Sequence, residues 1–277
     1  MKNGTSCFNQ IGCVEEKRVD RFAVNIHFPC GVVTSDQMEF IAEVARQFGE
    51  GTARITLKQS IEITGIQAGE LQAAQRELAR GGLTIASAGR CIDTIVTCCG
   101  EQNCCSGLMP TQQLADRILK KWQQVELPNY ISIAIAGCPN ACTAPLLADI
   151  GVIGVAMPEP RGMPRGHSRT ERFECPEGAI AYSGDEAVWH QDLCTYCGQC
   201  IDFCDLGGWK LAKKGYTVYL GGQLGRHPRL GAKTAEFLSE DETVALIDRT
   251  LDVFKQSASP GEKFADFIKN FDIEKLR

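Results

Sequence analysis

Fifteen of the 277 residues are cysteines, and four of them form two closely spaced pairs. Cys98 and Cys104 are separated by five residues, whereas Cys138 and Cys142 are separated by three in the segment Gly-Cys-Pro-Asn-Ala-Cys. About one helix and one strand lie between the pairs, so both can reach one place in the fold. Because four thiolates at one place can hold a cubic [4Fe–4S] cluster, the spacing predicts such a cluster.

A second group of cysteines has a tighter spacing. Cys194, Cys197 and Cys200 are each separated by two residues, and Cys204 follows after three more. Bacterial ferredoxins hold a [4Fe–4S] cluster with cysteines at this spacing. Zinc sites usually place two cysteines close together and two far away, so three ligands in one loop favour iron and sulfur over zinc.

The fourth ligand of this second cluster has two candidates, Cys175 and Cys204. In two-cluster ferredoxins, the fourth cysteine of each run serves the other cluster. The segment Cys175-Pro-Glu-Gly resembles the end of such a run, although Arg165, Ser168 and Glu171 stand where its other cysteines would be. We therefore expect Cys175, rather than Cys204, to complete the second cluster.

The composition argues against several other classes of protein. The net charge of -5 is unlike that of a nucleic-acid binder, which usually has a basic surface. The sequence has no run of about 18 apolar residues, the length that a membrane span requires. Its first residues also lack the apolar core of a signal peptide. We therefore expect a protein of the reducing cytoplasm, where cysteines are more often metal ligands than disulfides.

The surrounding sequence predicts the elements that must position these cysteines. An N-terminal α+β module is expected from a strand at 22–28, a helix that Thr34 or Ser35 caps, a strand over 53–63 and a helix over 67–80. Strands at 92–97 and 130–136 lead into the two cysteine pairs, and a helix over 110–124 lies between them. The later elements are strands at 150–155 and 217–220 and helices at 241–254 and 262–271.

The cysteine pattern and four further segments resemble the sulfite and nitrite reductase family. The family has the same C-x5-C…C-x3-C arrangement, with its second pair in a Gly-Cys-Pro-Asn-x-Cys segment. The segment Gly-Thr-Ala-Arg-Ile-Thr-Leu-Lys-Gln at 51–59 is similar to a family strand. Other similar segments are 149–154, 216–222 and 225–228. A ferredoxin unit like that of the second group is found in the dissimilatory and small anaerobic sulfite reductases. The resemblance covers nearly the whole chain.

The resemblance implies an α+β fold in three parts. Residues 1–90 would be a ferredoxin-like half-domain, and residues 91–172 and 208–277 would form the siroheme and [4Fe–4S] domain. Residues 173–207 would be a ferredoxin-type insert. The Pro-, Gly- and Arg-rich segment Pro158–Arg172 would be the linker into that insert.

The resemblance also implies siroheme, with Cys142 bridging its iron to the first cluster. The family's Cys-Pro-Gly segment aligns with Cys98-Cys99-Gly100. We therefore choose Cys98 and Cys104 as ligands over the equally spaced Cys99 and Cys105. The remaining cysteines outside the two groups are expected to be small buried residues. They are Cys7, Cys13, Cys30, Cys91, Cys99 and Cys105.

Cationic residues and backbone N–H groups should surround siroheme, because it carries many carboxylates. The family motifs place Arg54, Lys58, Arg226 and the Gly221-Gly222 turn as candidates for binding the cofactor. Arg54, Lys58 and Arg90 are the candidates for acting on the substrate. The substrate would be a small oxyanion, which is sulfite in the first instance.

The sequence departs from the family in the segment before the second cysteine pair. Two lysines that usually bind the anion there are replaced by Tyr130 and Ser132, and Asp93 replaces an arginine. Arg90 could substitute for that arginine. Because a buried anion needs compensating charge, three alternatives remain open. They are a reductase with a rearranged pocket, a reductase of another substrate such as nitrite, and a siroheme-binding electron-transfer subunit.

The chain also predicts partners. Larger family members contain two half-domains of this kind, whereas this sequence has one. We therefore expect a homodimer or a complex with a related subunit. Reduced ferredoxin or a flavoprotein would supply the electrons.

Overall fold

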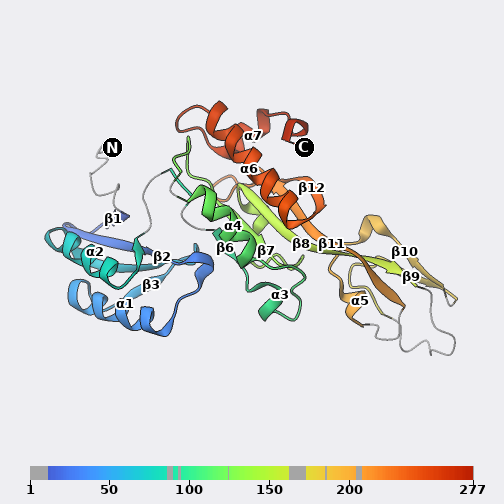
Figure 1. Cartoon of the computed structure of the whole chain (residues 1–277), viewed down its shortest axis with the longest axis horizontal. Coiled ribbons are helices and arrows are strands. Elements are labelled where there is room, and N and C mark those ends of the chain that lie inside the picture. Colours follow the sequence, from blue (N-terminus) through green and yellow to red (C-terminus); the bar gives the residue numbers. More distant parts are fainter. Residues whose placement is uncertain are drawn as a thin grey trace. The chain divides into compact units, whose positions relative to one another are not determined.

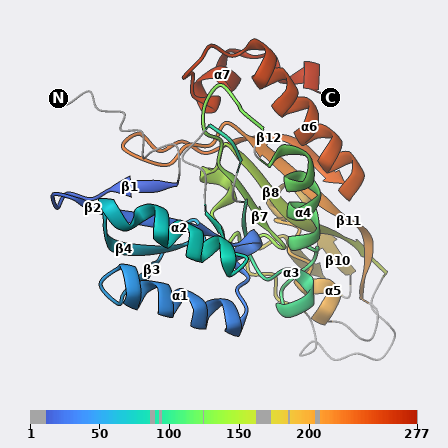
Figure 2. The ribbon, with the colours of Figure 1, turned by 60° about the vertical axis from the view of Figure 1, so that its left-hand side comes forward.

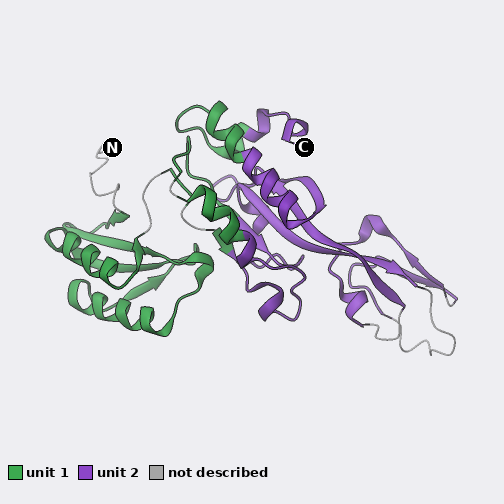
Figure 3. Cartoon of the chain, viewed as in Figure 1, with its two compact units in different colours: residues 1–96, 115–133, 251–267 green, residues 97–114, 134–250, 268–277 purple. Residues whose placement is uncertain are grey.

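The computed structural model describes residues 12–85, 90–92, 95–123, 125–161, 173–184, 186–203 and 208–276. The chain divides into two compact units, which are coloured separately in Figure 3. Unit 1 contains residues 1–96, 115–133 and 251–267, and unit 2 contains residues 97–114, 134–250 and 268–277. Both core cysteine pairs and the described cysteines of the expected insert belong to unit 2.

Unit 1 contains an antiparallel sheet with the strand order β1-β2-β4-β3, and β5 pairs with β2. Its strands are β1 (Cys13–Glu15), β2 (Arg21–His27), β3 (Ala53–Ile55), β4 (Ile61–Gln67) and β5 (Thr84–Ile85). Helices α1 (Ser35–Phe48) and α2 (Leu71–Arg80) lie next to each other and contact this sheet (Figure 2). The short 3-10 helices Pro29–Gly31 and Ala68–Glu70 complete this part.

The start of α1 follows from its capping residue, as expected. Thr34 Oγ1 accepts a hydrogen bond from the backbone N–H of Gln37, and the Gln37 side chain accepts one from the backbone N–H of Thr34. This reciprocal capping box satisfies two N–H groups that the helix cannot pair internally. The helix then ends at Phe48, before the expected Gly49.

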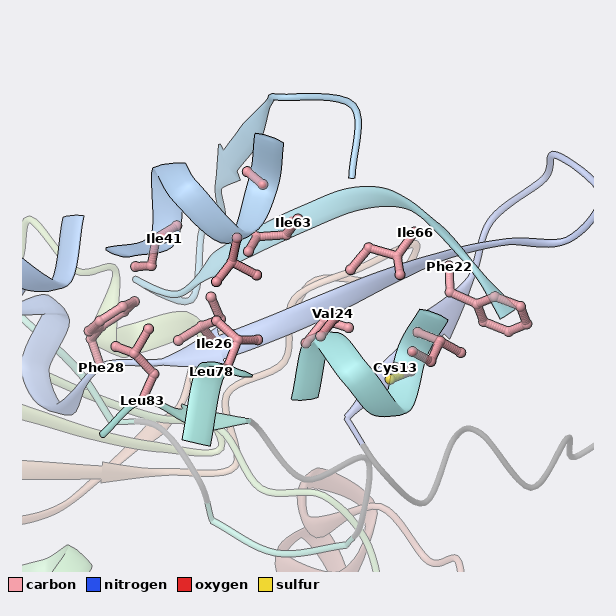
Figure 4. Close-up of a cluster of buried hydrophobic side chains, with 14 residues drawn as sticks. Cys13, Phe22, Val24, Ile26, Phe28, Ile41, Ile63, Ile66, Leu78 and Leu83 are labelled. Atoms are coloured by element: carbon pink, nitrogen blue, oxygen red, sulfur yellow. The ribbon is translucent and has the colours of Figure 1, made fainter. Parts of the chain in front are cut away.

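Aliphatic side chains from the sheet and both helices form the core of unit 1. Figure 4 shows Val24 and Ile26 of β2 and Ile63 of β4 pointing toward the side chains of Ile41 and Leu78 from the helices. Each of these five side chains is at least 97% buried. Cys13 also lies in this core, and Cys30 and Cys91 are buried elsewhere in the chain, which confirms the expected burial of these three cysteines.

The single strand expected over 53–63 is instead a hairpin. Strands β3 and β4 pair antiparallel, and the turn between them is closed by the Thr56 N–H, which donates to the carbonyl of Ser60 at 2.9 Å. The hydroxyls of Thr56 and Ser60 are 2.6 Å apart, and Gln59 has a φ of 56°. The turn places Lys58 at an exposed tip.

The second sheet has the order β12-β11-β8-β7-β6. Its strands are β6 (Ile95–Thr97), β7 (Ile133–Ala136), β8 (Ile150–Pro160), β11 (Trp209–Leu220) and β12 (Ala232–Leu238). The accompanying helices are α3 (Gly100–Asn103), α4 (Gln112–Trp122), α6 (Glu240–Ser257) and α7 (Phe264–Asn270), with 3-10 turns at Pro145–Leu147 and Ile273–Leu276. Among the described residues, every helix is too short or too polar to cross a bilayer.

Strands β8 and β11 are much longer than the sequence predicted. They pair antiparallel from Ile150 opposite Leu220 to Pro160 opposite Trp209, and they form a long two-stranded ribbon (Figure 1). At the far end of the ribbon lie β9 (Ile180–Ser183), β10 (Glu186–Trp189), the 3-10 helix Gln191–Leu193 and α5 (Gln199–Phe203). The start of the expected linker is therefore strand up to Pro160, and residues 162–172 lie outside the described part.

Candidate functional site

The two core cysteine pairs are brought together by neighbouring strands of the second sheet. Strand β6 leads into Cys98, and β7 leads into Gly137 and Cys138. The Cys98 N–H donates to the carbonyl of Ile135 at 3.2 Å, and the Gly137 N–H donates to Cys98 Sγ at 3.1 Å. Backbone N–H groups aimed at a cysteine sulfur favour the thiolate that an iron site requires.

The electrostatic environment of Cys138 agrees with the chosen ligand register. Burial raises the pKa of the Cys138 thiol, the Asn140 N–H lowers it, and the sulfurs of Cys98, Cys104 and Cys142 raise it further. The sulfurs of Cys98, Cys104 and Cys142 therefore each lie close enough to Cys138 to disfavour its thiolate. Bound iron would supply the compensating positive charge.

The expectation that Cys99 and Cys105 are buried was wrong. Both side chains are exposed, whereas Cys98 and Cys104 are partly buried. The reason is the short helix α3, which begins directly after Cys99 and ends just before Cys104. This local turn faces the two ligand cysteines inward and their neighbours outward.

Cys142 lies in a constrained loop with its side chain exposed. The neighbouring Ala141 and Ala144 both have left-handed φ values, 49° and 50°, which cost energy in residues other than glycine. Thr143 Oγ1 is buried and has no hydrogen-bond partner among the described residues. An exposed cysteine beside a buried hydroxyl without a partner fits the bridging role expected for Cys142. A bound group at this place could coordinate the Cys142 sulfur and accept a hydrogen bond from the Thr143 hydroxyl.

The loop after Cys142 is held by the two glycines expected to bind siroheme. A Cβ on Gly222 would lie 2.3 Å from the carbonyl oxygen of Ala148, so only glycine permits this approach. Gly221 has a φ of +80°, and its N–H donates to the carbonyl of Asp149 at 2.8 Å. Both glycines therefore have a packing role, and their binding of a cofactor stays a prediction.

In the insert, Cys175, Cys194, Cys197 and Cys200 line one small cavity. The charges of Cys175 and Cys197 both act on Cys194 and on Cys200. The structure thus brings together the four cysteines that the sequence predicted as ligands, and their ligand role stays a prediction. Cys204, the alternative fourth ligand, lies outside the described residues.

Burial disfavours the free thiolate at two cysteines of the expected insert. Burial raises the pKa of Cys200 to about 12 and also raises that of Cys194. The Tyr196 N–H, 3.4 Å from Cys194 Sγ, acts in the opposite direction, and the indole of Trp189 does so from nearby without forming a hydrogen bond of normal geometry. Bound iron would supply the compensating positive charge at these sulfurs.

Three of the four candidate cations are in unit 1. The guanidinium of Arg54 is 71% exposed and lies 3.8 Å from a Glu62 carboxylate oxygen. The ammonium of Lys58 lies 4.2 Å from the centre of the Tyr130 ring. Arg90 has an exposed side chain, as does Arg226 in unit 2. Tyr130 therefore does not supply the missing charge itself, but it contacts a residue that carries one.

Sequence reasoning missed several residues that contact the ligand cysteines. Thr143 and Trp189 belong to no spacing pattern, and Leu108 and Ala156 are ordinary apolar residues in sequence. Only the folded chain places Leu108 and Ala156 against Cys138 in one buried cluster. No local sequence signal could have identified these contacts.

Comparison with known proteins identifies the family. The "Nitrite and sulphite reductase 4Fe-4S domain" matches residues 88–277, and the "Nitrite/Sulfite reductase ferredoxin-like half domain" matches residues 15–81. The chain therefore belongs to the nitrite and sulfite reductase family. The 4Fe-4S domain includes both core cysteine pairs, so the chain carries an iron–sulfur cluster site.

The similar proteins include named sulfite reductases. The chain is 30% identical over 236 residues to a coenzyme F420-dependent sulfite reductase of Methanocaldococcus jannaschii, covering 85% of this chain but 38% of that protein. It is 21% identical over 267 residues to an assimilatory-type sulfite reductase of Nitratidesulfovibrio vulgaris, covering 96% and 95%. The crystal structure of dissimilatory sulfite reductase I matches with a TM-score of 0.74 at 19% identity, covering 92% of this chain and 68% of that one. This last match supports the α+β fold.

Proposed function

We propose that this chain is a sulfite reductase-like oxidoreductase that reduces a small oxyanion, with sulfite as its first candidate substrate. The reaction would take place at siroheme coupled to a [4Fe–4S] cluster. The observation that carries this proposal is the proximity of Cys98, Cys104 and Cys142 to Cys138. Of these four cysteines, Cys142 is the exposed one. The named sulfite reductases that resemble this chain along most of its length support sulfite.

The residues of this chain would hold the cofactors and bind the anion. Siroheme, when bound, would supply redox chemistry at iron for the reduction of sulfite to sulfide and water, which consumes six electrons and six protons. Cys142 would give its thiolate to both metal groups. Arg54 and Lys58 would place positive charge beside siroheme carboxylates or the substrate, since charged hydrogen bonds are the stronger kind.

The cysteines of the insert would hold a second [4Fe–4S] cluster that receives single electrons. Reduced ferredoxin or a flavoprotein would be the donor. The support for a docking site near this cluster is the exposure of Leu193 and Phe203, at 50% and 55%, on either side of the Cys194–Cys200 loop. Large apolar side chains exposed beside a redox centre are suited to a transient protein contact.

A second candidate function is reduction of nitrite, or electron transfer without turnover. The observation that favours it is the absence of cationic side chains at Tyr130 and Ser132. Nitrite carries less charge than sulfite, so its binding needs less compensation. The Lys58 ammonium against the Tyr130 ring would supply one positive charge near this segment.

Assembly is part of the proposal, because the sequence has one half-domain. A second copy of this chain or a related subunit would supply the other. Light scattering on the cofactor-loaded protein tests this point. A strictly monomeric loaded protein that reduces sulfite would contradict it.

Turnover tests the proposed function. Protein purified without oxygen and loaded with siroheme would be supplied with reduced methyl viologen and either sulfite or nitrite. We expect oxidation of the viologen with stoichiometric sulfide from sulfite. Cys142→Ala should abolish this reaction, whereas Cys105→Ala, at an exposed cysteine outside the ligand set, should preserve it. Ammonia from nitrite without sulfide would support the second candidate, and no turnover of either anion would leave only the electron-transfer function.

A further inference from the structure

Strand β8 holds the two groups of cysteines beside each other. On one side of β8, a Cβ on Gly154 would lie 2.4 Å from the carbonyl oxygen of Gly137, the residue before Cys138. Two residues further along, the Ala156 N–H donates to the carbonyl of Tyr196 at 2.9 Å, and Ala156 forms a parallel bridge with Cys197. Two residues of a strand rise about 7 Å. The segments that carry Cys138 and Cys197 therefore contact neighbouring positions of one strand.

Leu108 closes the space between these segments. Its N–H donates to the carbonyl of Gly137 at 2.9 Å, and its side chain packs with Cys138 and Ala156 in a buried cluster. A Cβ on Gly198 would lie 3.1 Å from Leu108 Cδ2 and 3.4 Å from Ala156 Cβ. The loop of the insert is thus in contact with both apolar side chains.

A second observation places the two ligand groups together. A cavity of about 370 Å³ is lined by Cys138 from the core group and by Cys197 from the insert. The chain enters and leaves the insert at the far end of the ribbon, where Pro160 pairs with Trp209. Since those connections are remote from Ala156, the contacts at Ala156 and Leu108 fold the cysteine loop back onto the core.

We propose that Leu108 and Ala156 are positioning residues that fix the separation of the two clusters, with Cys138 and Cys197 as the nearest pair of ligands. This inference rests on the second cluster of the proposed function. In the step that it governs, one electron leaves the reduced cluster of the insert, which is oxidised, and enters the core cluster, which is reduced. An external one-electron donor then reduces the insert again.

Two glycines of the insert allow a matched test. Gly198 and Gly178 have similar left-handed φ values, +76° and +67°, so alanine strains the backbone equally at both. Alanine at Gly198 would press on Leu108, whereas nothing lies within 4 Å of a Cβ at Gly178. Comparing Gly198→Ala with Gly178→Ala therefore separates the contact from the backbone strain. Leu108→Ala removes the contact without any change in the loop, and Leu108→Met restores most of its volume.

The experiment follows both clusters in the loaded protein without any substrate. Acid-labile sulfide confirms that each variant retains its clusters. Electron paramagnetic resonance of the dithionite-reduced protein reports the magnetic interaction between them, and rapid mixing followed by freezing reports the rate at which each is reduced. We expect Leu108→Ala and Gly198→Ala to weaken the interaction and to slow reduction of the core cluster several-fold, with reduction of the insert unchanged. Gly178→Ala and Leu108→Met should behave like the wild-type protein.

The inference would be overturned if a Leu108→Ala protein that retains both clusters showed the wild-type magnetic interaction between them and the wild-type rate of core-cluster reduction. If Gly198→Ala fails to assemble, the pair Leu108→Ala and Leu108→Met decides alone. About four labile sulfides in the wild-type protein, instead of about eight, would mean that only one cluster is present, and both this inference and the proposed second cluster would then be wrong. Failure to reduce sulfite or nitrite would contradict the proposed function and leave this measurement intact, because no substrate is present.

Discussion

Replacing Cys175 with alanine should remove the insert cluster and leave the core cluster in place. Cys175 lines the same cavity as Cys194, Cys197 and Cys200, and it is the ligand most distant from them in sequence. The core ligands would be untouched, since Cys98, Cys104, Cys138 and Cys142 form their own group. Cys204→Ala is the matched control, because it removes the competing candidate.

The size of the effect follows from the burial of the remaining thiols. Burial, together with the charges of Cys197, Cys194 and Cys175, raises the pKa of Cys200 to about 12 from an ordinary value of 9.0. At about 1.4 kcal/mol per pKa unit, ionising this thiol costs on the order of 4 kcal/mol more than ionising an exposed one. Iron must offset this cost, and three ligands offset it less well than four. We therefore expect labile sulfide to fall from about eight to about four per chain.

The assay is acid-labile sulfide and iron on protein purified without oxygen, together with paramagnetic resonance of the reduced state. Cys175→Ala should show the core cluster alone, and Cys204→Ala should match the wild-type protein. The reverse result, with loss in Cys204→Ala and a full complement in Cys175→Ala, would refute the ligand assignment.

Three further predictions concern groups around these sites. Trp189→Phe should lower the reduction potential of the insert cluster, because it removes a buried indole N–H that has no hydrogen-bond partner among the described residues and whose proximity favours the Cys194 thiolate. A redox titration with an unchanged potential would contradict this role. In iron-free protein, the folded-state pKa of Cys200 is raised above its ordinary value, so this thiol stabilises the fold below about pH 9 and that contribution disappears as the pH approaches 12. Alkylation of Cys200 at pH 8, followed by mass spectrometry, should accordingly be much slower than alkylation of exposed Cys105. Equal alkylation rates would argue against the burial of Cys200. Tyr130→Leu should raise the KM for the anion about two- to fivefold, because the contact between the Tyr130 ring and Lys58 is lost. Tyr130→Phe retains the ring and should leave the KM unchanged. Equal effects of both variants on the KM would show that the ring face is not involved.

The sequence predicted the cysteine groups well because cluster ligands are encoded by short spacings. Cys98 and Cys138 also follow strands with clear apolar patterns, so their convergence could be expected from the order of the elements. The capping of α1 by Thr34 was confirmed for a similar reason, since a cap and its helix are neighbours in sequence.

Features that depend on the exposed side of an element were predicted less well. The outer, N-terminal half of β11 contains Lys210, Lys213 and Lys214, so its apolar pattern begins only after the strand has started. The turn of the β3–β4 hairpin contains neither glycine nor proline, and Gln59 adopts its left-handed conformation instead. The usual turn signals were therefore absent.

Contacts between distant segments could not be predicted at all. The exposure of Cys99 depends on the four residues of α3, and the bridge from Ala156 to Cys197 joins residues 41 positions apart. Neither produces a periodic pattern in the sequence. Such contacts are set by packing of the complete fold.

The central claim is that this chain carries siroheme together with two iron–sulfur clusters. An absorption spectrum of protein purified without oxygen, recorded with a count of acid-labile sulfide, tests it most directly. We predict the absorption bands of siroheme and about eight labile sulfides per chain. Bound zinc without labile sulfide or siroheme bands would contradict the claim.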